Sequence, residues 1–186
     1  MKMLPEIKGL NELKKLKTAY QNFIKTRYEL NAQDCQTCPT KGACCIDAHF
    51  VNVHITKLEA TAIGETLGKL SAEKQAKIYR RAAETVEKYN LKCSGDTFAQ
   101  TFACPLFEKG TGCLIHFEGK PSPCISHACY ENEEDLPPEI LQQQTEMSIE
   151  RLNNRTYGKS WTWLPLPVWL NLINPFKKIN EFAESD

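Results

Sequence analysis

The sequence predicts a mainly α-helical small domain with an irregular, cysteine-rich region and few or no strands. Apolar residues repeat at helical spacing near the N-terminus, and helix-capping residues precede later helices. The nine cysteines fall in stretches that have little periodicity. We expect one domain, 1–186, because 186 residues can enclose one core. It comprises an N-terminal helix in 1–34, a cysteine-cluster core in 35–130, and a C-terminal helix with a Trp/Pro-rich tail in 131–186.

A first helix is predicted over 11–30, because apolar residues recur there every three to four positions. Basic residues fall largely on the opposite face, which is typical of a core-packing helix with a solvated side. A nucleic-acid surface is the alternative for this face. The predicted buried residues are Leu10, Leu13, Leu16, Tyr20, Phe23, Ile24 and Leu30, and the predicted basic face holds Lys14, Lys15, Lys17, Lys25 and Arg27.

Two helices with identifiable starts are expected in the middle of the chain. The segment 50–55 alternates in polarity and predicts a short strand or an extended entry into a helix. Thr56 and Glu59 form a capping-box sequence, so a helix should begin there and pause near Gly68. Ser71 can cap the next helix, and the two would form a helical hairpin. The predicted apolar face of the second helix is Ala72, Ala76, Tyr79, Ala83 and Val86.

The C-terminal third predicts one helix and an irregular tail. Pro137 and Pro138 should open a helix up to about Arg151, with Ile140, Leu141, Ile149 and Leu152 as buried candidates. The tail segment 161–170 holds three tryptophans and two prolines, which predicts an extended, non-helical strap that closes the core. Docking of an unknown protein partner through Trp161–Leu170 is the alternative, because exposed aromatic residues mark interfaces.

The most informative stretch is 35–45, where four cysteines stand among polar turn residues. Two cysteines separated by two residues can bind one metal ion, while nearby backbone N–H groups hydrogen-bond the sulfurs. Gly42 would let the chain fold back, so that Cys44 or Cys45 reaches the same centre. Buried, inert thiols are the alternative, but these normally lie in apolar runs. The stretch therefore predicts metal binding by Cys35, Cys38, Cys44 and Cys45.

Five further cysteines lie between 92 and 130. Cys104, Cys113 and Cys124 each adjoin proline or glycine, as metal ligands on loops often do. Cys129 brings the candidate ligands to eight, and Cys93, which has no comparable partner spacing, is predicted to be a free thiol.

Composition limits the remaining classes of function. Lys plus Arg and Asp plus Glu number 23 each, and this neutral balance argues against nucleic acid as the main partner. No apolar run is long enough to span a bilayer, and residues 1–9 lack the apolar core of a signal peptide. We therefore expect a cytoplasmic protein, in whose reducing surroundings cysteines indicate metal or redox chemistry rather than disulfides.

These motifs, in this order, resemble the YkgJ-type cysteine-cluster family, also described as the CxxCxxCC or zinc- or iron-chelating domain. The resemblance covers about residues 35–130. It departs from the family pattern at His116, where tyrosine is common, and at Lys120 and Ile125, where arginine is common. Its elements are Cys35-x2-Cys38, Gly42-Ala-Cys44-Cys45, Val51-Asn-Val53 followed by Glu59, Cys104-Pro-Leu, Gly112-Cys113-Leu-Ile and Lys120-Pro121-x2-Cys124.

The resemblance implies that the cysteines bind metal, either zinc or an iron–sulfur cluster, because both accept four thiolates. Eight thiolates suffice for two such sites, or for one site with the others around it. Neighbouring side chains diverge, so Cys44 and Cys45 would serve different centres, or one is spare. Each histidine is expected to be exposed or satisfied, and His127 is the best placed to be a ligand. The histidines are His49, His54, His116 and His127.

Three functions follow from these expectations. The first is a metal-binding protein with a structural or electron-carrying site. The second is a redox or modifying enzyme that uses an iron–sulfur centre, for which Glu59, Glu118 and His116 are the nearest titratable candidates. The flagellin lysine N-methylases, which carry a similar cluster, suggest this second possibility. The third is a zinc-handling or thiol stress protein, which needs exposed cysteines of low pKa.

Overall fold

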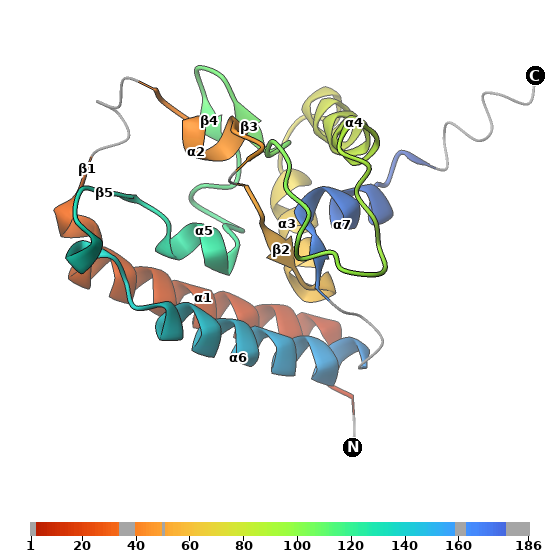
Figure 1. Cartoon of the computed structure of the whole chain (residues 1–186). Helices are drawn as coiled ribbons and strands as arrows, with labels where there is room; N and C mark the ends of the chain where they lie inside the picture. The colour runs from red at the N-terminus through yellow and green to blue at the C-terminus, as the bar shows by residue number, and fades with distance from the viewer. Residues whose placement is uncertain (1–2, 34–39, 50, 159–162, 178–186) are drawn as a thin grey trace, which may run out of the picture.

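A computed structural model describes residues 3–33, 40–49, 51–158 and 163–177. The described part is mainly α-helical, as predicted, with seven α-helices and three two-stranded antiparallel sheets. Two long helices, α1 (Glu6–Arg27) and α6 (Glu139–Tyr157), run side by side in opposite directions along one side (Figure 1). None of the helices in the described ranges combines the length and apolar character needed to cross a membrane.

The other three longer helices surround the main hydrophobic core. They are α3 (Lys57–Leu67), α4 (Ala72–Lys88) and α7 (Leu166–Leu172). Helix α4 packs chiefly against α7, and α3 contacts α1, α6 and α7 (Figure 1). Ile63, Tyr79, Phe102 and Trp169 are among the buried residues that join these helices to the loop after α4.

Short elements complete the described chain. The sheets pair β1 with β5, β2 with β6 and β3 with β4. The short elements are η1 (Glu29–Asn31), β1 (Ala32–Gln33), α2 (Ala43–Ile46), β2 (His54–Ile55), β3 (Phe107–Glu108), β4 (Gly112–Cys113), α5 (Ser122–Ser126), β5 (Cys129–Tyr130), η2 (Glu133–Asp135) and β6 (Leu164–Pro165).

The predicted helix starts after residue 55 are confirmed. Thr56 caps α3, and its side chain and that of Glu59 form the expected capping box. Ser71 caps α4, and Pro138 precedes the first residue of α6. Helix α3 ends at Leu67 with Gly68 as its C-cap, which is also as predicted.

The predicted limits of the first and last long helices are wrong in part. Helix α1 begins at Glu6 and ends at Arg27, so Leu30 falls in η1 and is 80% exposed. Phe23 and Ile140, both predicted to be buried, are also exposed. Helix α6 continues to Tyr157, six residues beyond the expected end, because nothing in the intervening sequence breaks a helix.

The expected hairpin of the two middle helices is also wrong, because the main helix neighbour of α4 is α7. The buried residues of α4 are Ile78, Tyr79 and Ala82, whereas Ala72 and Ala76 are exposed. The core face of α4 is therefore rotated from the predicted one, towards the C-terminal segment.

The tail differs most from the prediction. Trp161 lies outside the described residues, but 166–172 form helix α7 instead of an extended strap. Pro165 stands at the N-cap and Pro167 in the first turn, where a helix has no N–H partner to lose, so neither proline prevents it. Residues 164–170 are buried, which confirms that they close the core. A partner could reach these side chains only if they left the core.

Candidate metal centre

Six of the eight candidate ligands lie in the described chain, five of them on short elements. Cys44 and Cys45 are on α2, Cys113 on β4 and Cys124 on α5. Cys104 lies three residues before β3, and Cys129 is the first residue of β5. Cys35 and Cys38 lie outside the described residues. Of the three cysteines expected on loops, only Cys104 lies on one. Cys113 is on a strand, and Cys124 is on a short helix, which Pro121 and Pro123 open.

Gly42 sets the position of the Cys44–Cys45 pair. It has a φ of +85°, a left-handed conformation that glycine adopts without strain, and α2 begins at the next residue. A Cβ at this position would overlap the ring of Phe107, so only glycine allows α2 to approach the segment that follows Cys104. The chain therefore turns at Gly42, as predicted, whereas the approach of α2 to Cys35 and Cys38 lies outside the described residues.

Backbone hydrogen bonds hold three of the cysteine segments together. The Cys104 N–H donates to the Cys45 carbonyl oxygen at 2.7 Å, which ties α2 to the segment before β3. The short β3–β4 pair sets Phe107 opposite Cys113, and the N–H of Leu114 donates to the carbonyl of Leu106 at 3.0 Å. Segments that are distant in sequence therefore bring their cysteines side by side.

The thiols of Cys45, Cys104, Cys113 and Cys124 interact electrostatically with one another, and we call these four residues the thiol group. Cys45 interacts with Cys104 and Cys124, and Cys113 interacts with the same two residues. Burial raises the pKa of Cys104 to about 11, and burial also raises the pKa of Cys113 and of Cys124. Without a compensating positive charge, these thiols are therefore protonated near neutral pH.

Several groups nevertheless favour the thiolate forms. The N–H groups of Leu106 and Phe107 donate to the sulfur of Cys104, and this lowers its pKa against the effect of burial. The N–H of Ile115 acts in the same way on the pKa of Cys113. In each case the N–H group belongs to a residue two or three positions after the cysteine. Backbone N–H groups in this arrangement stabilise metal-bound thiolates.

The two adjacent cysteines of α2, Cys44 and Cys45, lie in different surroundings. Cys45 is half-buried within the thiol group, whereas Cys44 is exposed and interacts with His127. The hydrogen bond from Cys45 and then the His127 ring lower the pKa of Cys44. The same hydrogen bond, together with burial, raises the pKa of Cys45. The two neighbouring thiols therefore contact each other, although their other partners differ.

The remaining cysteines differ in their contacts. Cys129 is the strand partner of Gln33, the last described residue before the segment that contains Cys35 and Cys38. Cys93 is exposed on the loop after α4. No disulfide joins any of the cysteines that the structure describes.

Among the described residues, no three Cys, His, Asp or Glu side chains are arranged as a set able to hold one metal ion. Two of the eight predicted ligands were outside this search, because they lie in the segment 34–39.

Three histidines lie away from α2, one of them buried and two exposed. His54 is buried, its Nε2 lies 2.8 Å from the Thr97 carbonyl oxygen, and its ring stacks on Phe98. His49 and His116 are exposed. His116 contacts Phe117 edge to face.

A buried ion pair between α1 and α3 escaped the sequence analysis, which assigned Lys17 to the solvated face. Lys17 is 8% exposed and Glu59 is fully buried, and their Nζ and Oε1 atoms are 3.3 Å apart. The helical spacing of Lys17 with Leu13, Tyr20 and Ile24 is the signal that could have indicated burial. The sequence analysis nevertheless assigned Lys17 to solvent, because a charged lysine is seldom buried without a partner.

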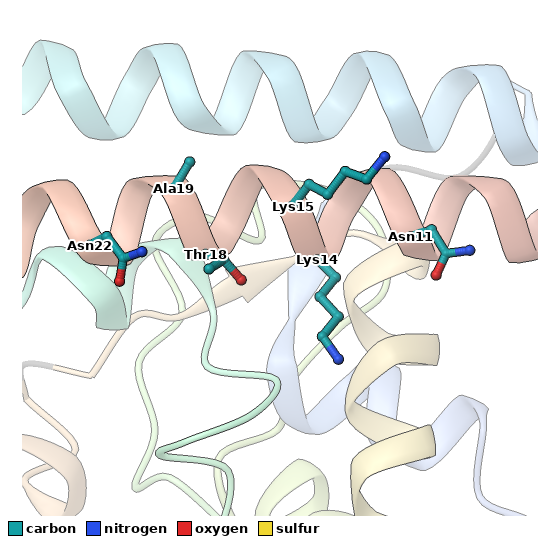
Figure 2. A pocket seen from close by; sticks show the side chains of 6 residues that line it. All are labelled: Asn11, Lys14, Lys15, Thr18, Ala19 and Asn22. Atoms are coloured by element: carbon teal, nitrogen blue, oxygen red, sulfur yellow. The ribbon is translucent and has the colours of Figure 1, made fainter.

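The other titratable candidates lie at the surface. Glu118 forms ion pairs with Lys69 at 2.6 Å and with Lys14 at 3.8 Å, and the hydrogen bond from Lys69 lowers the pKa of Glu118. An open hollow of about 630 Å³ lies along α1 (Figure 2). All its lining residues come from this single helix, and none is a cysteine: Asn11, Lys14, Lys15, Thr18, Ala19 and Asn22.

No protein-family model matches this chain, and neither a curated protein nor a solved structure shows significant similarity to it. The resemblance to the cysteine-cluster family therefore stays a prediction from the motifs.

Proposed function

We propose that this protein binds metal through its clustered cysteines, as zinc or an iron–sulfur cluster, in a structural or electron-carrying role. The observation that carries the proposal is the thiol group itself. Its four cysteines come from α2, the segment before β3, β4 and α5, across 80 positions of sequence, and their thiols interact. Placing buried thiols near one another raises their pKa values and adds little stability to the fold unless a cation binds between them.

The chemistry of the donors suits a thiolate-bound metal. Zinc and iron in such sites take cysteine sulfur, and protein N–H groups directed at the sulfurs adjust the centre. Cys104 and Cys113 have such N–H donors. The thiol group would supply part of the ligand set, and the predicted set adds Cys35, Cys38, Cys44 and Cys129. A bound zinc would cross-link these segments, and a bound cluster would add one-electron chemistry.

Metal and sulfide content test this proposal. We expect protein purified without oxygen to contain zinc, or iron with acid-labile sulfide and a brown colour. Cys124→Ser should lower both metal content and the melting temperature, because Cys124 interacts with all three other members of the thiol group. Cys93→Ser is the matched control and should change neither, because Cys93 is exposed and lies outside the group. Full metal content in Cys124→Ser would contradict the proposal.

A zinc-handling or thiol-reactive role is a second candidate, and the observation in its favour is Cys44. This thiol is exposed and has a histidine beside it, which are the features of a reactive cysteine. The two roles separate under a chelator. Zinc that leaves within minutes, with rapid alkylation of Cys44, would favour the handling role, and retained metal would favour the structural one.

A further inference from the structure

The α1–α6 pair has an outer side that carries exposed apolar residues. Figure 1 shows the other labelled helices and strands all on the inner side of this pair. Ile140 and Met147 are seven residues apart, so they share one face of α6, and Leu136 precedes them. Large apolar side chains grouped in this way mark a surface that binds another protein. Four such side chains are between 42% and 53% exposed here: Phe23, Leu136, Ile140 and Met147.

Phe23 of α1 belongs to the same end of the pair as Ile140. The two helices are antiparallel, and Leu13 of α1 meets Ile149 of α6 in one hydrophobic cluster. Phe23 is ten residues further along α1, which is level with a position ten residues back along α6, next to Ile140. The exposed apolar residues therefore come from both helices.

The charge changes sign along α6. Residues 131–139 contain five acidic residues and no basic one, whereas residues 151–155 contain two arginines and no acidic residue. Both arginines are exposed, and so are the acidic residues except Asp135, which is half-buried. Glu150 adjoins the arginines in sequence, but it points about 100° away from Arg151 around the helix axis. We call 131–139 the acidic end and 151–155 the basic end.

Neither end is neutralised by ion pairs. Within the part of the chain that the structure describes, no salt bridge involves an acidic residue of 131–139 or an arginine of 151–155. Lys8 of α1 adds to the basic end, because it lines an open hollow of about 430 Å³ between α1 and α6 together with Arg155. Lys25 and Arg27 lie at the α1 terminus nearest the acidic end, where the acidic residues outnumber them.

We infer that the outer side of the α1–α6 pair joins two copies of this chain, with the two α6 helices antiparallel across the interface. A two-fold axis that crosses α6 at a right angle near Met147 places the acidic end of each copy against the basic end of the other. Glu139 and Arg155 are each eight residues from Met147, so the two ends meet in register. The exposed apolar residues then lie between the charged contacts. The inference does not depend on metal binding.

The size of this surface sets the expected affinity. Helix α6 has 19 residues and is about 28 Å long, and two adjacent helices are about 20 Å wide. Each copy can therefore bury about 600 Å², which gives a total at the lower end of specific interfaces, and we expect a Kd on the order of 10 μM. Interaction with the helix dipole alone would also favour acidic residues before α6 and arginines near its end. That explanation predicts a monomer, and it does not account for the exposed apolar residues.

Sedimentation equilibrium of the full-length protein tests the inference, at concentrations from well below to well above the expected Kd. A phosphine reductant keeps the exposed cysteines from linking two copies through a disulfide. The wild type should form a dimer, and its Kd should rise with NaCl concentration, because salt screens the attraction between exposed charges.

Two charge-reversed variants test the pairing of the ends. Arg151→Glu with Arg155→Glu gives a chain with two acidic ends, and Glu133→Lys with Glu134→Lys and Glu139→Lys gives one with two basic ends. Each variant alone should dimerise about a hundredfold more weakly than the wild type, because each reversed charge acts twice in a symmetric interface. An equimolar mixture of the two should regain most of the wild-type affinity, because every acidic end then meets a basic one.

Lys74→Glu with Lys109→Glu is the control for net charge. It makes the same change in charge as the arginine variant, at exposed residues of α4 and of the β3–β4 turn, and should dimerise as the wild type does. A wild type that stays monomeric at the highest concentration overturns the inference. A dimer that survives in both charge-reversed variants overturns it, and so does a mixture that fails to associate. If circular dichroism shows that a variant is unfolded, a wild-type Kd that does not change with salt overturns the inference instead.

Discussion

Replacement of Trp169 by alanine should be among the most damaging changes in this chain. Trp169 is 2% exposed and belongs to the main core, where α7 packs on α4. A tryptophan buries about 200 Å², and at about 25 cal/mol per Å² this corresponds to about 5 kcal/mol. That figure is an upper bound, because the unfolded chain already buries part of the ring. We expect a loss of about 3–5 kcal/mol in the free energy of unfolding.

Urea unfolding at 25 °C, followed by circular dichroism, measures this loss. With a slope of about 2 kcal/mol per M, the midpoint should fall by about 2 M. Leu172→Ala is the control on the same helix, because Leu172 is 52% exposed and should cost under about 1 kcal/mol. Similar midpoints for the two variants would refute the assignment of α7 to the core.

Two other predictions concern a turn and a carboxyl group. Gly42→Ala should cost about 2–4 kcal/mol in the free energy of unfolding, from left-handed strain plus overlap with Phe107. Gly95→Ala, which is also at positive φ but in open space, should cost only the strain. Equal melting temperatures for the two variants would contradict this. Burial raises the pKa of Glu146, so stability should fall as pH rises from the unfolded pKa of 4.5 through the pKa of the folded protein. Glu146→Gln should therefore melt about 1 °C higher than the wild type at pH 7 and no higher at pH 4. A gain in melting temperature at both pH values would exclude this cause.

The parts of the fold that the sequence predicted are those set by local chemistry. Thr56 and Ser71 cap helices through hydrogen bonds that span three residues, so a few letters suffice to locate those starts. Helix α7 was missed because two prolines suggested a break, although a helix accepts proline in its first turn. Its seven residues are too few to be stable alone, so the helix depends on burial of Trp169 and Leu170, which local patterns do not report.

The candidate ligands were chosen from the sequence, but their arrangement could not be. Spacing and turn residues led to the prediction that the cysteines bind metal, and that assignment stays a prediction. Their grouping depends on long-range contacts, such as the hydrogen bond between Cys104 and Cys45, which lie 59 positions apart. The partners of Lys17 depend on such contacts too, because Glu59 and Gly119 reach it from other segments.

The elements that carry the thiols have little stability of their own. Helix α5 has five residues and α2 has four, and β4 has two, all shorter than elements that persist in isolation. They are attached to the cores by a few buried side chains, among them Leu106, Ile115 and Ile125. Helices α3, α4 and α7 share the main core, and Cys104 and Cys113 pack against it from outside. A metal bound by the cysteines would therefore act mainly on the order of this region, while the helical core supplies the scaffold that brings its segments together.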